Sequence, residues 1–514
     1  MKRELWFVFL AAVLLYLPTV QYGFVQDDRA IIVSNPAAHS VGAALGAFDD
    51  SYWPRESGAG LYRPVTILSF SIDWTLGRGR PGWFHVVNAL WHGVVTVLLV
   101  LVLVRWLPPL AAAAAGLVFA WHPVHVEAVA SIVGRAELLA AAGIFGAVLA
   151  ARRGWWAAAV VLAGLAMFSK EHGVIAGVVI LIDRWLQGTD RRYPLGLWAG
   201  LAGITVAYIV IWGMVGVAGA SAPAAVFYGR DTWDRLAVAL PAVLRAAVLL
   251  VWPVSLSSDY SPQVIPAYDG LSVAAVLGVL IVISVPALTI VCRRPAPAIS
   301  FTTAVAAFSF LPASNLLFAG GVVLAERNLY LAVALPAALL GAAIGRLMEA
   351  RTPHAARRRR ATVLVTTLAA LAGAALVLIR LPAWRDNRAQ LLTLLAEHPE
   401  SYLGHASAAA VLAGRGDTAG ARQQYRIADS LFVGDPYLDA AHAIFLLSVG
   451  DTGGARPLIQ RIKTRTETPA SRMALRAQFL FDLRRGDVAA AQAALDSARR
   501  RFPEDESWYR QYYQ

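Results

Sequence analysis

Apolar segments of near-spanning length recur along the first 380 residues. They are expected at 5–22, 85–104, 110–121, 137–151, 155–168, 173–186, 195–217, 236–254, 271–291, 298–318, 329–347 and 361–380. Several fall short of the roughly 20 residues that a bilayer of about 30 Å requires, which suggests helices that stop at a water-filled cavity. The pattern predicts an all-α, polytopic membrane protein.

The basic loops at Arg191-Arg192 and Arg293-Arg294 both carry the charge typical of the cytoplasmic side, yet three apolar segments lie between them. An odd number of crossings cannot join two loops on one side. We therefore expect 219–245 to be partly interfacial or re-entrant, which leaves about eleven transmembrane helices.

A different pattern begins after residue 380. Gly416-Asp417, Gly450-Asp451 and Gly486-Asp487 recur at spacings of 34 and 36 residues, and each is followed by an alanine five positions after the glycine. A period near 34 with small residues at the helix crossing is the tetratricopeptide pattern, although a plain helical bundle is an alternative. We expect a transmembrane domain at 1–380 and a C-terminal α-solenoid of about three repeats at 381–514, with a groove suited to an extended peptide.

Composition supports the membrane interpretation. The chain is 58% hydrophobic and 15% charged, against about 25% charged residues in soluble domains. Most of the net charge of +12 lies before residue 381, in loops rather than on one face, so nucleic acid is a disfavoured partner. The single cysteine, Cys292, excludes an internal disulfide. The charge pattern places the N-terminus inside, as an uncleaved signal anchor, and the C-terminus outside.

Two adjacent carboxylates, Asp27 and Asp28, follow the first apolar segment on the predicted outer side. An acidic pair at the edge of a bilayer is costly to desolvate. Such a pair is suited to act as a general base towards a substrate at the membrane surface.

A polar stripe opens the next helix, because His85, Asn88 and His92 are spaced i, i+3, i+7 and share one face. Polar groups on a membrane helix face protein or a cavity rather than lipid. Hydrogen bonding between helices and contact with substrate are both open.

The second outer loop contains His122, His125 and Glu127 in a His-x-x-His-x-Glu pattern. Pro123 breaks the helix that would align the two histidines, and no third ligand is evident, so no metal site is predicted.

Three basic residues on the outer side, Arg135, Lys170 and Arg327, are candidates for binding a lipid phosphate. Each has an alternative. Arg135 has Glu137 nearby, Lys170 has Glu171 next to it, and Arg327 could extend to the interface. No Walker loop, GxGxxG, HExxH, GxSxG or CxxC motif occurs, so ATP-driven transport and zinc proteolysis have no motif support.

These motifs, taken in order, resemble the transmembrane-and-tetratricopeptide-repeat (TMTC-type) protein O-mannosyltransferases and their bacterial relatives. The matching segments are Phe24-Val25-Gln26-Asp27-Asp28, Asn35-Pro36, Tyr62-Arg63-Pro64, His85-Val86-Val87-Asn88, His122-Pro123-Val124-His125-Val126-Glu127-Ala128-Val129, Gly134-Arg135-Ala136-Glu137, Ser169-Lys170-Glu171 and Glu326-Arg327-Asn328-Leu329-Tyr330. Asn328 stands where the family often has an aromatic residue. The resemblance covers nearly the whole chain, with a shorter repeat array than in animal members.

The resemblance implies a C-type glycosyltransferase (GT-C) fold and a polyprenyl-phosphate-linked sugar as donor. It implies that Asp27 and Asp28 are catalytic, that one of them is the base, with Asp27 favoured, and that transfer inverts the sugar. Lys170, Arg135 and Arg327 would offset charge on the leaving phosphate. No cofactor is assigned, and the need for a divalent cation is open. The remaining residues expected around the substrate are Arg63, His85, Asn88, His92, His122, His125, Glu127, Glu137, Glu171 and Glu326.

We therefore expect transfer of a sugar, mannose in the first instance, to a Ser or Thr hydroxyl of an exported protein held by the repeat groove. The expected location is a bacterial inner membrane with the C-terminal domain outside. Two other hypotheses remain: the acceptor is a cell-surface glycan or lipid, or the chain is a membrane scaffold that recruits partners through its repeats.

Overall fold

The chain is helical throughout the part that the structure describes. The computed structural model describes residues 1–53, 60–188, 193–216, 223–266, 270–349, 355–464 and 472–502. Within these ranges the only β-type pairing is an isolated bridge between Pro262 and Ile265. The predicted all-α class is confirmed.

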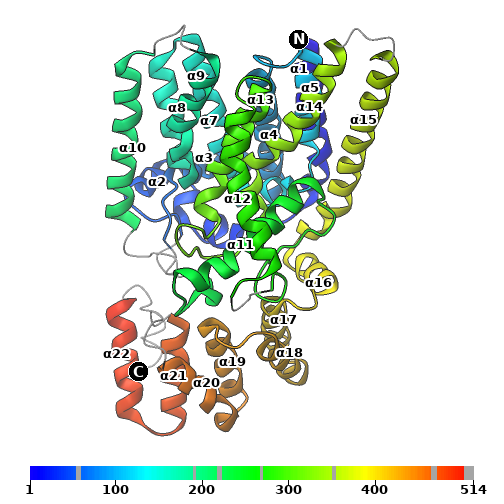
Figure 1. Cartoon of the computed structure of the whole chain (residues 1–514). Coiled ribbons are helices and arrows are strands. Elements are labelled where there is room, and N and C mark those ends of the chain that lie inside the picture. The colour runs from blue at the N-terminus through cyan, green and yellow to red at the C-terminus, as the bar shows by residue number, and fades with distance from the viewer. Residues whose placement is uncertain are drawn as a thin grey trace.

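The first part of the chain forms a bundle of fifteen helices (Figure 1). They are α1 (Lys2–Tyr16), α2 (Val41–Ala44), α3 (Pro64–Gly77), α4 (Pro81–Leu103), α5 (Pro109–Ala120), α6 (His125–Ala130), α7 (Arg135–Arg153), α8 (Trp156–Ser169), α9 (Ala176–Gln187), α10 (Leu195–Gly216), α11 (Thr232–Val251), α12 (Val273–Val291), α13 (Pro297–Phe310), α14 (Ala334–Glu349) and α15 (Ala355–Arg380).

Seven helices of the described residues are long and apolar enough to cross a membrane, and three shorter ones are apolar. The long ones correspond to α1, α4, α7, α10, α12, α14 and α15, and the short ones correspond to α5, α8 and α13. The other two expected segments are also helical, as α9 and α11. The chain is a polytopic membrane protein.

Helix α11 lies in the stretch with the odd number of predicted crossings. It is 20 residues long but carries Asp234, Arg235 and Arg245, and it is not among the seven long apolar helices. The expectation that 219–245 is partly interfacial or re-entrant stays a prediction, and residues 219–222 and the Arg191-Arg192 loop lie outside the described residues.

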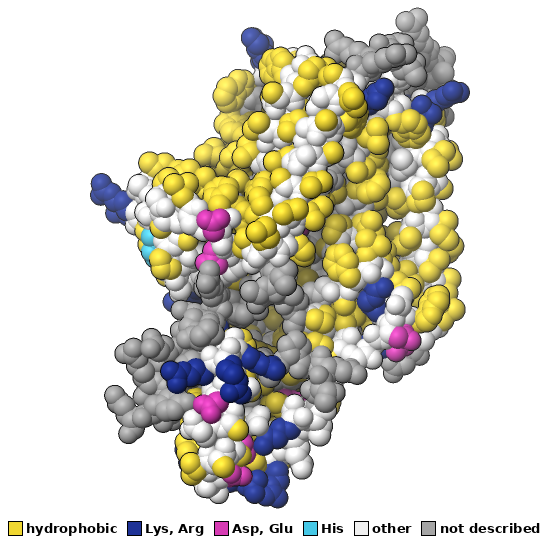
Figure 2. All heavy atoms as spheres, turned by 90° about the vertical axis from the view of Figure 1, so that its left-hand side faces the viewer, with side chains coloured by type: hydrophobic (Ala, Val, Ile, Leu, Met, Phe, Trp, Pro, Cys, Tyr) yellow, Lys and Arg dark blue, Asp and Glu magenta, His cyan; other side chains and the backbone are white. Residues whose placement is uncertain are grey.

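The outer surface of the bundle is suited to lipid. Large apolar side chains such as Leu195, Met214 and Val273 are about 80% exposed, which water would penalise and acyl chains would not. Figure 2 shows hydrophobic side chains covering the bundle on one face, with basic and acidic side chains gathered over the C-terminal helices.

The N-terminus and the C-terminal helices lie at opposite ends of the bundle (Figure 1). Helices α5, α8 and α13 all end at the side of the C-terminal helices, where the loops that follow them meet. Several predicted site residues follow these helices and therefore lie at this end: His122 and His125 after α5, Lys170 and Glu171 after α8, and Glu326 and Arg327 after α13.

The C-terminal part consists of α16 (Asn387–Glu397) followed by three helix pairs. The pairs are α17 (Tyr402–Gly414) with α18 (Thr418–Leu431), α19 (Pro436–Ser448) with α20 (Thr452–Thr464), and α21 (Arg472–Arg484) with α22 (Val488–Arg501). The expected end of the domain, residues 503–514, lies outside the described residues.

Each Gly-Asp pair makes the turn between the two helices of a pair. Gly416, Gly450 and Gly486 have φ of 83°, 82° and 74°, a left-handed conformation that glycine adopts without steric cost. The following aspartate caps the next helix: Asp417 accepts a hydrogen bond from the Gly420 amide, for example. The repeated motif therefore has a local structural cause in all three pairs.

Candidate active site

Asp27 and Asp28 occupy different environments. Asp28 is fully buried, and its two carboxylate oxygens accept hydrogen bonds from the amides of Val25 and Val133, both at 2.9 Å. Asp27 is half-buried, and its carboxylate makes no hydrogen bond or ion pair with the described residues. Asp28 therefore ties the first outer loop to the 131–134 turn, and Asp27 is the carboxylate left free to contact a substrate.

Burial raises the pKa of Asp28 to about 7, although its two backbone hydrogen bonds act in the opposite direction. That value would suit a base, but a base must contact the proton that it removes. Since Asp28 is enclosed by backbone, geometry favours Asp27 for that role.

Three ion pairs join segments that are distant in the chain. Arg63 donates two hydrogen bonds to Glu171, at 2.9 and 2.8 Å. The other two pairs are Lys170 with Glu137 and Arg327 with Glu127. The loops after α8 and α13 are thus fixed against α6, α7 and the start of α3.

The three pairs form one electrostatic cluster. Glu127 is the main group that raises the pKa of Arg327, and Asp27 acts in the same direction. Arg327 and Arg63 in turn both act on Lys170. Lys170 also donates a hydrogen bond of 3.3 Å to the side chain of Asn328, next to Arg327. Two of the three proposed phosphate-binding cations, Lys170 and Arg327, therefore lie in the same cluster as the free carboxylate.

Arg135, the third proposed cation, faces away from this cluster. It is 1% exposed and forms an ion pair of 2.8 Å with Asp73 of α3. It also donates hydrogen bonds to the side chain of Asn88 and to the carbonyl of Phe84. The partners of Arg135 lie inside the protein, which is the structural ion pair that the sequence left open beside phosphate binding, and the acidic partner is Asp73 rather than the neighbouring Glu137.

Asn88 and Arg135 instead support the turn that holds Asp28. The Asn88 amide donates to the carbonyls of Val129, Ser131 and Ile132 at 3.1–3.3 Å. Val133, the next residue of that turn, donates to Asp28. The polar stripe on α4 thus forms hydrogen bonds to other segments of the protein, which is one of the two alternatives left open by the sequence.

The histidines also bond to protein groups. His92 lies 2.8 Å from the Tyr330 hydroxyl and 3.0 Å from the Ala120 carbonyl, and His85 lies 3.4 Å from the Gly23 carbonyl. His122 and His125 lie 3.2 and 3.1 Å from the carbonyls of Leu250 and Tyr330. These five contacts place the four histidines in the packing between protein segments.

No group of three or more His, Cys, Asp or Glu side chains is arranged to hold a metal ion within the described residues. Burial lowers the pKa of His122 to about 4, so its ring is neutral at pH 7. Glu127, the third member of the His-x-x-His-x-Glu pattern, is paired with Arg327 instead.

Glu326, predicted to face the substrate, is buried. One oxygen accepts hydrogen bonds from the Ser257 amide at 2.6 Å and the Tyr260 hydroxyl at 2.8 Å, and the other has no hydrogen-bond partner among the described residues. Burial raises the pKa of Glu326 to about 8. Glu326 thus links the loop after α13 to the 257–260 segment.

Sequence reasoning missed the roles of Asp73 and Tyr330. Asp73 lies in the apolar helix α3, where an acidic residue is itself a signal of a buried partner, but its partner is 62 positions away in the chain. Tyr330 contacts both His92 and His125, and no spacing within the sequence relates these residues.

Comparisons with known proteins identify homologues over much of the chain. Protein O-mannosyl-transferase F38B6.6 of Caenorhabditis elegans is 29% identical over 341 residues, which cover 64% of this chain and 49% of that protein. Protein O-mannosyl-transferase Tmtc1 of Drosophila melanogaster is 27% identical over 497 residues (77% and 58%). Protein O-mannosyl-transferase TMTC4 of Mus musculus is 27% identical over 481 residues (78% and 63%).

The chain is thus a homologue of TMTC-type protein O-mannosyltransferases, and it spans about half to two thirds of the length of these relatives. No protein-family model matches it. No solved structure matches it either.

Proposed function

We propose that this chain is an integral membrane glycosyltransferase that moves mannose from a polyprenyl-phosphate donor to a Ser or Thr hydroxyl of an exported protein. The observation that carries the proposal is Asp27: a half-buried carboxylate without a partner among the described residues, which acts electrostatically on Arg327, a member of the cluster of three ion pairs. The names of the homologues support the sugar and the kind of acceptor.

Asp27 takes the proton of the acceptor hydroxyl as its oxygen attacks the anomeric carbon of the sugar. The bond between that carbon and the phosphate oxygen breaks, and the lipid phosphate leaves with the electron pair. Attack from the face opposite the phosphate inverts the configuration at the anomeric carbon.

Lys170 and Arg327 offset the charge that develops on the leaving phosphate. Arg327 is the more accessible of the two, since 33% of its side chain is exposed against 10% for Lys170. The carboxylates Glu127 and Glu137 hold both cations in place before the donor binds.

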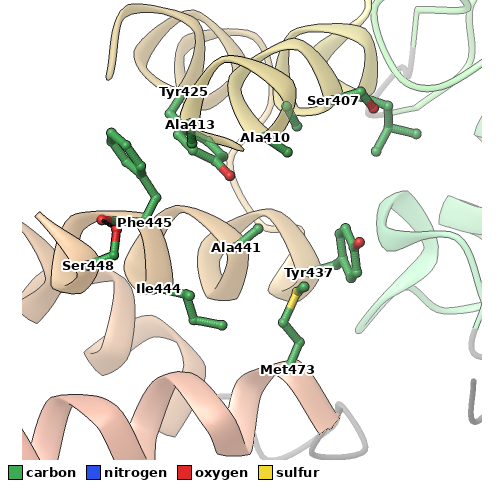
Figure 3. Close-up of a pocket in the computed structure, with 12 residues that line it drawn as sticks. Ser407, Ala410, Ala413, Tyr425, Tyr437, Ala441, Ile444, Phe445, Ser448 and Met473 are labelled. Carbon is green, nitrogen blue, oxygen red and sulfur yellow. Dashed lines mark hydrogen bonds between the residues drawn. The ribbon is translucent and has the colours of Figure 1, made fainter. Parts of the chain in front are cut away.

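The acceptor polypeptide lies in a groove of the C-terminal helices (Figure 3). This groove has a volume of about 500 Å³ and is lined by α17, α18, α19 and α21. None of its lining residues is charged, which favours an extended segment with small or apolar side chains. The lining residues are Leu403, Ala406, Ser407, Ala410, Ala413, Tyr425, Tyr437, Ala441, Ile444, Phe445, Ser448 and Met473.

The proposal is tested by reconstituting the full chain in vesicles with radiolabelled polyprenyl-phosphate-mannose and an exported protein. Transfer of label to Ser or Thr, with inversion at the anomeric carbon, is expected. Label that enters a glycan or lipid instead would change the acceptor class. No transfer from any polyprenyl-phosphate sugar would contradict the proposal and favour the scaffold.

The donor site is tested by Arg327→Gln. Loss of one charge-assisted hydrogen bond, about 1.5–3 kcal/mol, should raise the KM for the donor about 10- to 100-fold, with less effect on the KM for the acceptor. Arg422→Gln is the matched control, because it breaks another partly exposed pair of an arginine with a carboxylate, Asp451, on the C-terminal helices. A larger effect on the acceptor than on the donor would remove Arg327 from the phosphate site.

A further inference from the structure

The loop that carries Asp27 is bonded to the first residues of the C-terminal domain. The Gln26 amide donates a hydrogen bond of 2.7 Å to the side chain of Asn387, at the start of α16. The Gly23 amide donates one of 3.0 Å to the carbonyl of Arg385. Asp27 thus sits between two anchors, Asn387 on one side and the buried Asp28 on the other.

The conformation of Gln26 needs such support. Its φ is +46°, in the left-handed region, which is sterically unfavourable for a residue with a Cβ. Gln26 is exposed, so packing does not hold it there. The bond to Asn387 is the described contact that fixes its amide.

The adjacent contacts show that this junction is specific. Asp386 caps α16 by accepting a hydrogen bond from the Ala389 amide at 2.7 Å, which leaves the Asn387 side chain free to turn towards Gln26. The last membrane helix, α15, ends only a few residues earlier, at Arg380. The junction between the two domains is therefore also the support of the Asp27 loop.

Resting on the proposed function, we propose that Asn387 is a positioning residue for the general base. By holding Gln26 in its left-handed conformation, Asn387 orients the Asp27 carboxylate. Because Asn387 belongs to the C-terminal domain, which binds the acceptor, the rate of catalysis then depends on the position of that domain. Asn387 does not contact the substrate itself.

The kinetic test compares Asn387→Ala with Asn387→Asp. Alanine at the first position of α16 is a good helix former, so the helix should persist while the acceptor oxygen is lost. We expect kcat to fall about 3- to 10-fold with the KM for donor and acceptor unchanged, and Asn387→Asp, which keeps an oxygen at this position, to restore kcat. The matched control is Gln263→Ala, which removes another hydrogen bond between the domains, to the Leu431 carbonyl at 3.2 Å.

A second measurement does not depend on sugar transfer. Hydrogen exchange of the 22–30 peptide should speed up in Asn387→Ala and stay at the wild-type rate in Gln263→Ala and Asn387→Asp. If wild type transfers no sugar, the proposed function fails, and the exchange rates still decide whether Asn387 holds the loop. Equal exchange in Asn387→Ala and wild type, or a change in KM rather than kcat, would overturn the inference.

Discussion

At the scale of single residues, two adjacent aspartates have separate tasks. Asp28 is enclosed and bonded to two backbone amides, while Asp27 is partly open and acts electrostatically on Arg327. The sequence predicted the acidic pair, but could not distinguish its members, because the difference arises from the 131–134 turn more than 100 positions away. The ion pair of Arg135 with Asp73, 62 positions earlier in the chain, was likewise not visible from the sequence.

These separate roles predict that two similar substitutions differ in their effect on the free energy of unfolding. Asp28→Asn places an amide NH₂ against one of the two backbone N–H groups, and should lower the free energy of unfolding by about 1–3 kcal/mol. Asp27→Asn should leave the free energy of unfolding unchanged. Thermal unfolding of both variants in detergent measures the difference, and equal loss in the two would refute this assignment.

The raised pKa of Glu326 predicts how the free energy of unfolding depends on pH. Its pKa is raised to about 8 by burial, so the folded state keeps a proton that the unfolded state releases above a pKa of about 4.5. Stability should therefore fall as pH rises from about 5 to 8, and Asp28, with its raised pKa, adds in the same direction. Unfolding temperatures across this range should decline less steeply in Glu326→Gln, and an unchanged slope would show that Glu326 is not the group responsible.

At the scale of elements, the short helices position the site. Helices α5, α8 and α13 have 12, 14 and 14 residues, fewer than the roughly 20 that span a bilayer. The lengths of α5 and α8 match the expected segments at 110–121 and 155–168. Helix α13 instead ends at Phe310, eight residues before the expected end at 318, and is followed by a short 3₁₀ turn at Leu311–Ala313. The pairing of the loops that follow them was not predictable, since it depends on contacts such as Arg327 with Glu127, 200 positions apart.

The 131–134 turn requires glycine at position 134. A Cβ on Gly134 would lie 2.2 Å from the Ala128 carbonyl oxygen, which is backbone and cannot move aside cheaply. Gly134→Ala should displace the turn that holds Asp28, lower the unfolding free energy by about 2 kcal/mol or more, and reduce transfer. Gly177→Ala is the control, because its Cβ would meet nothing within 4 Å. Equal stability of the two variants, by thermal unfolding, would contradict the role given to this turn.

At the scale of the whole molecule, the C-terminal helices lie at one end of the bundle (Figure 1). The Asp27 loop lies at the same end, because Gln26 bonds to Asn387 at the start of the C-terminal helices. A donor lipid in the membrane and an acceptor in the C-terminal groove could reach this end from two sides. The division near residue 380 was visible in the sequence from composition and repeats. The contacts across it, such as Gln26 with Asn387, were not, because neither residue stands out locally.

The groove of the C-terminal helices predicts that filling it weakens binding of the acceptor and leaves binding of the donor unchanged. Ala410 is exposed on α17 and lines the groove, so Ala410→Trp should fill it and raise the KM for the acceptor polypeptide about tenfold while leaving the KM for the donor unchanged. Ala489→Trp, at an exposed alanine of α22 outside the groove lining, is the control. An equal KM for the acceptor in both variants would exclude this groove as its site.

The central claim is that Asp27 removes the proton from the acceptor hydroxyl. It is tested most directly by single-turnover transfer with Asp27→Asn, with donor binding measured on the same sample. We predict donor affinity equal to that of wild type and a transfer rate lower by about 10²- to 10⁴-fold, the usual contribution of a general base. Transfer within twofold of the wild-type rate, with the donor bound, would contradict the account.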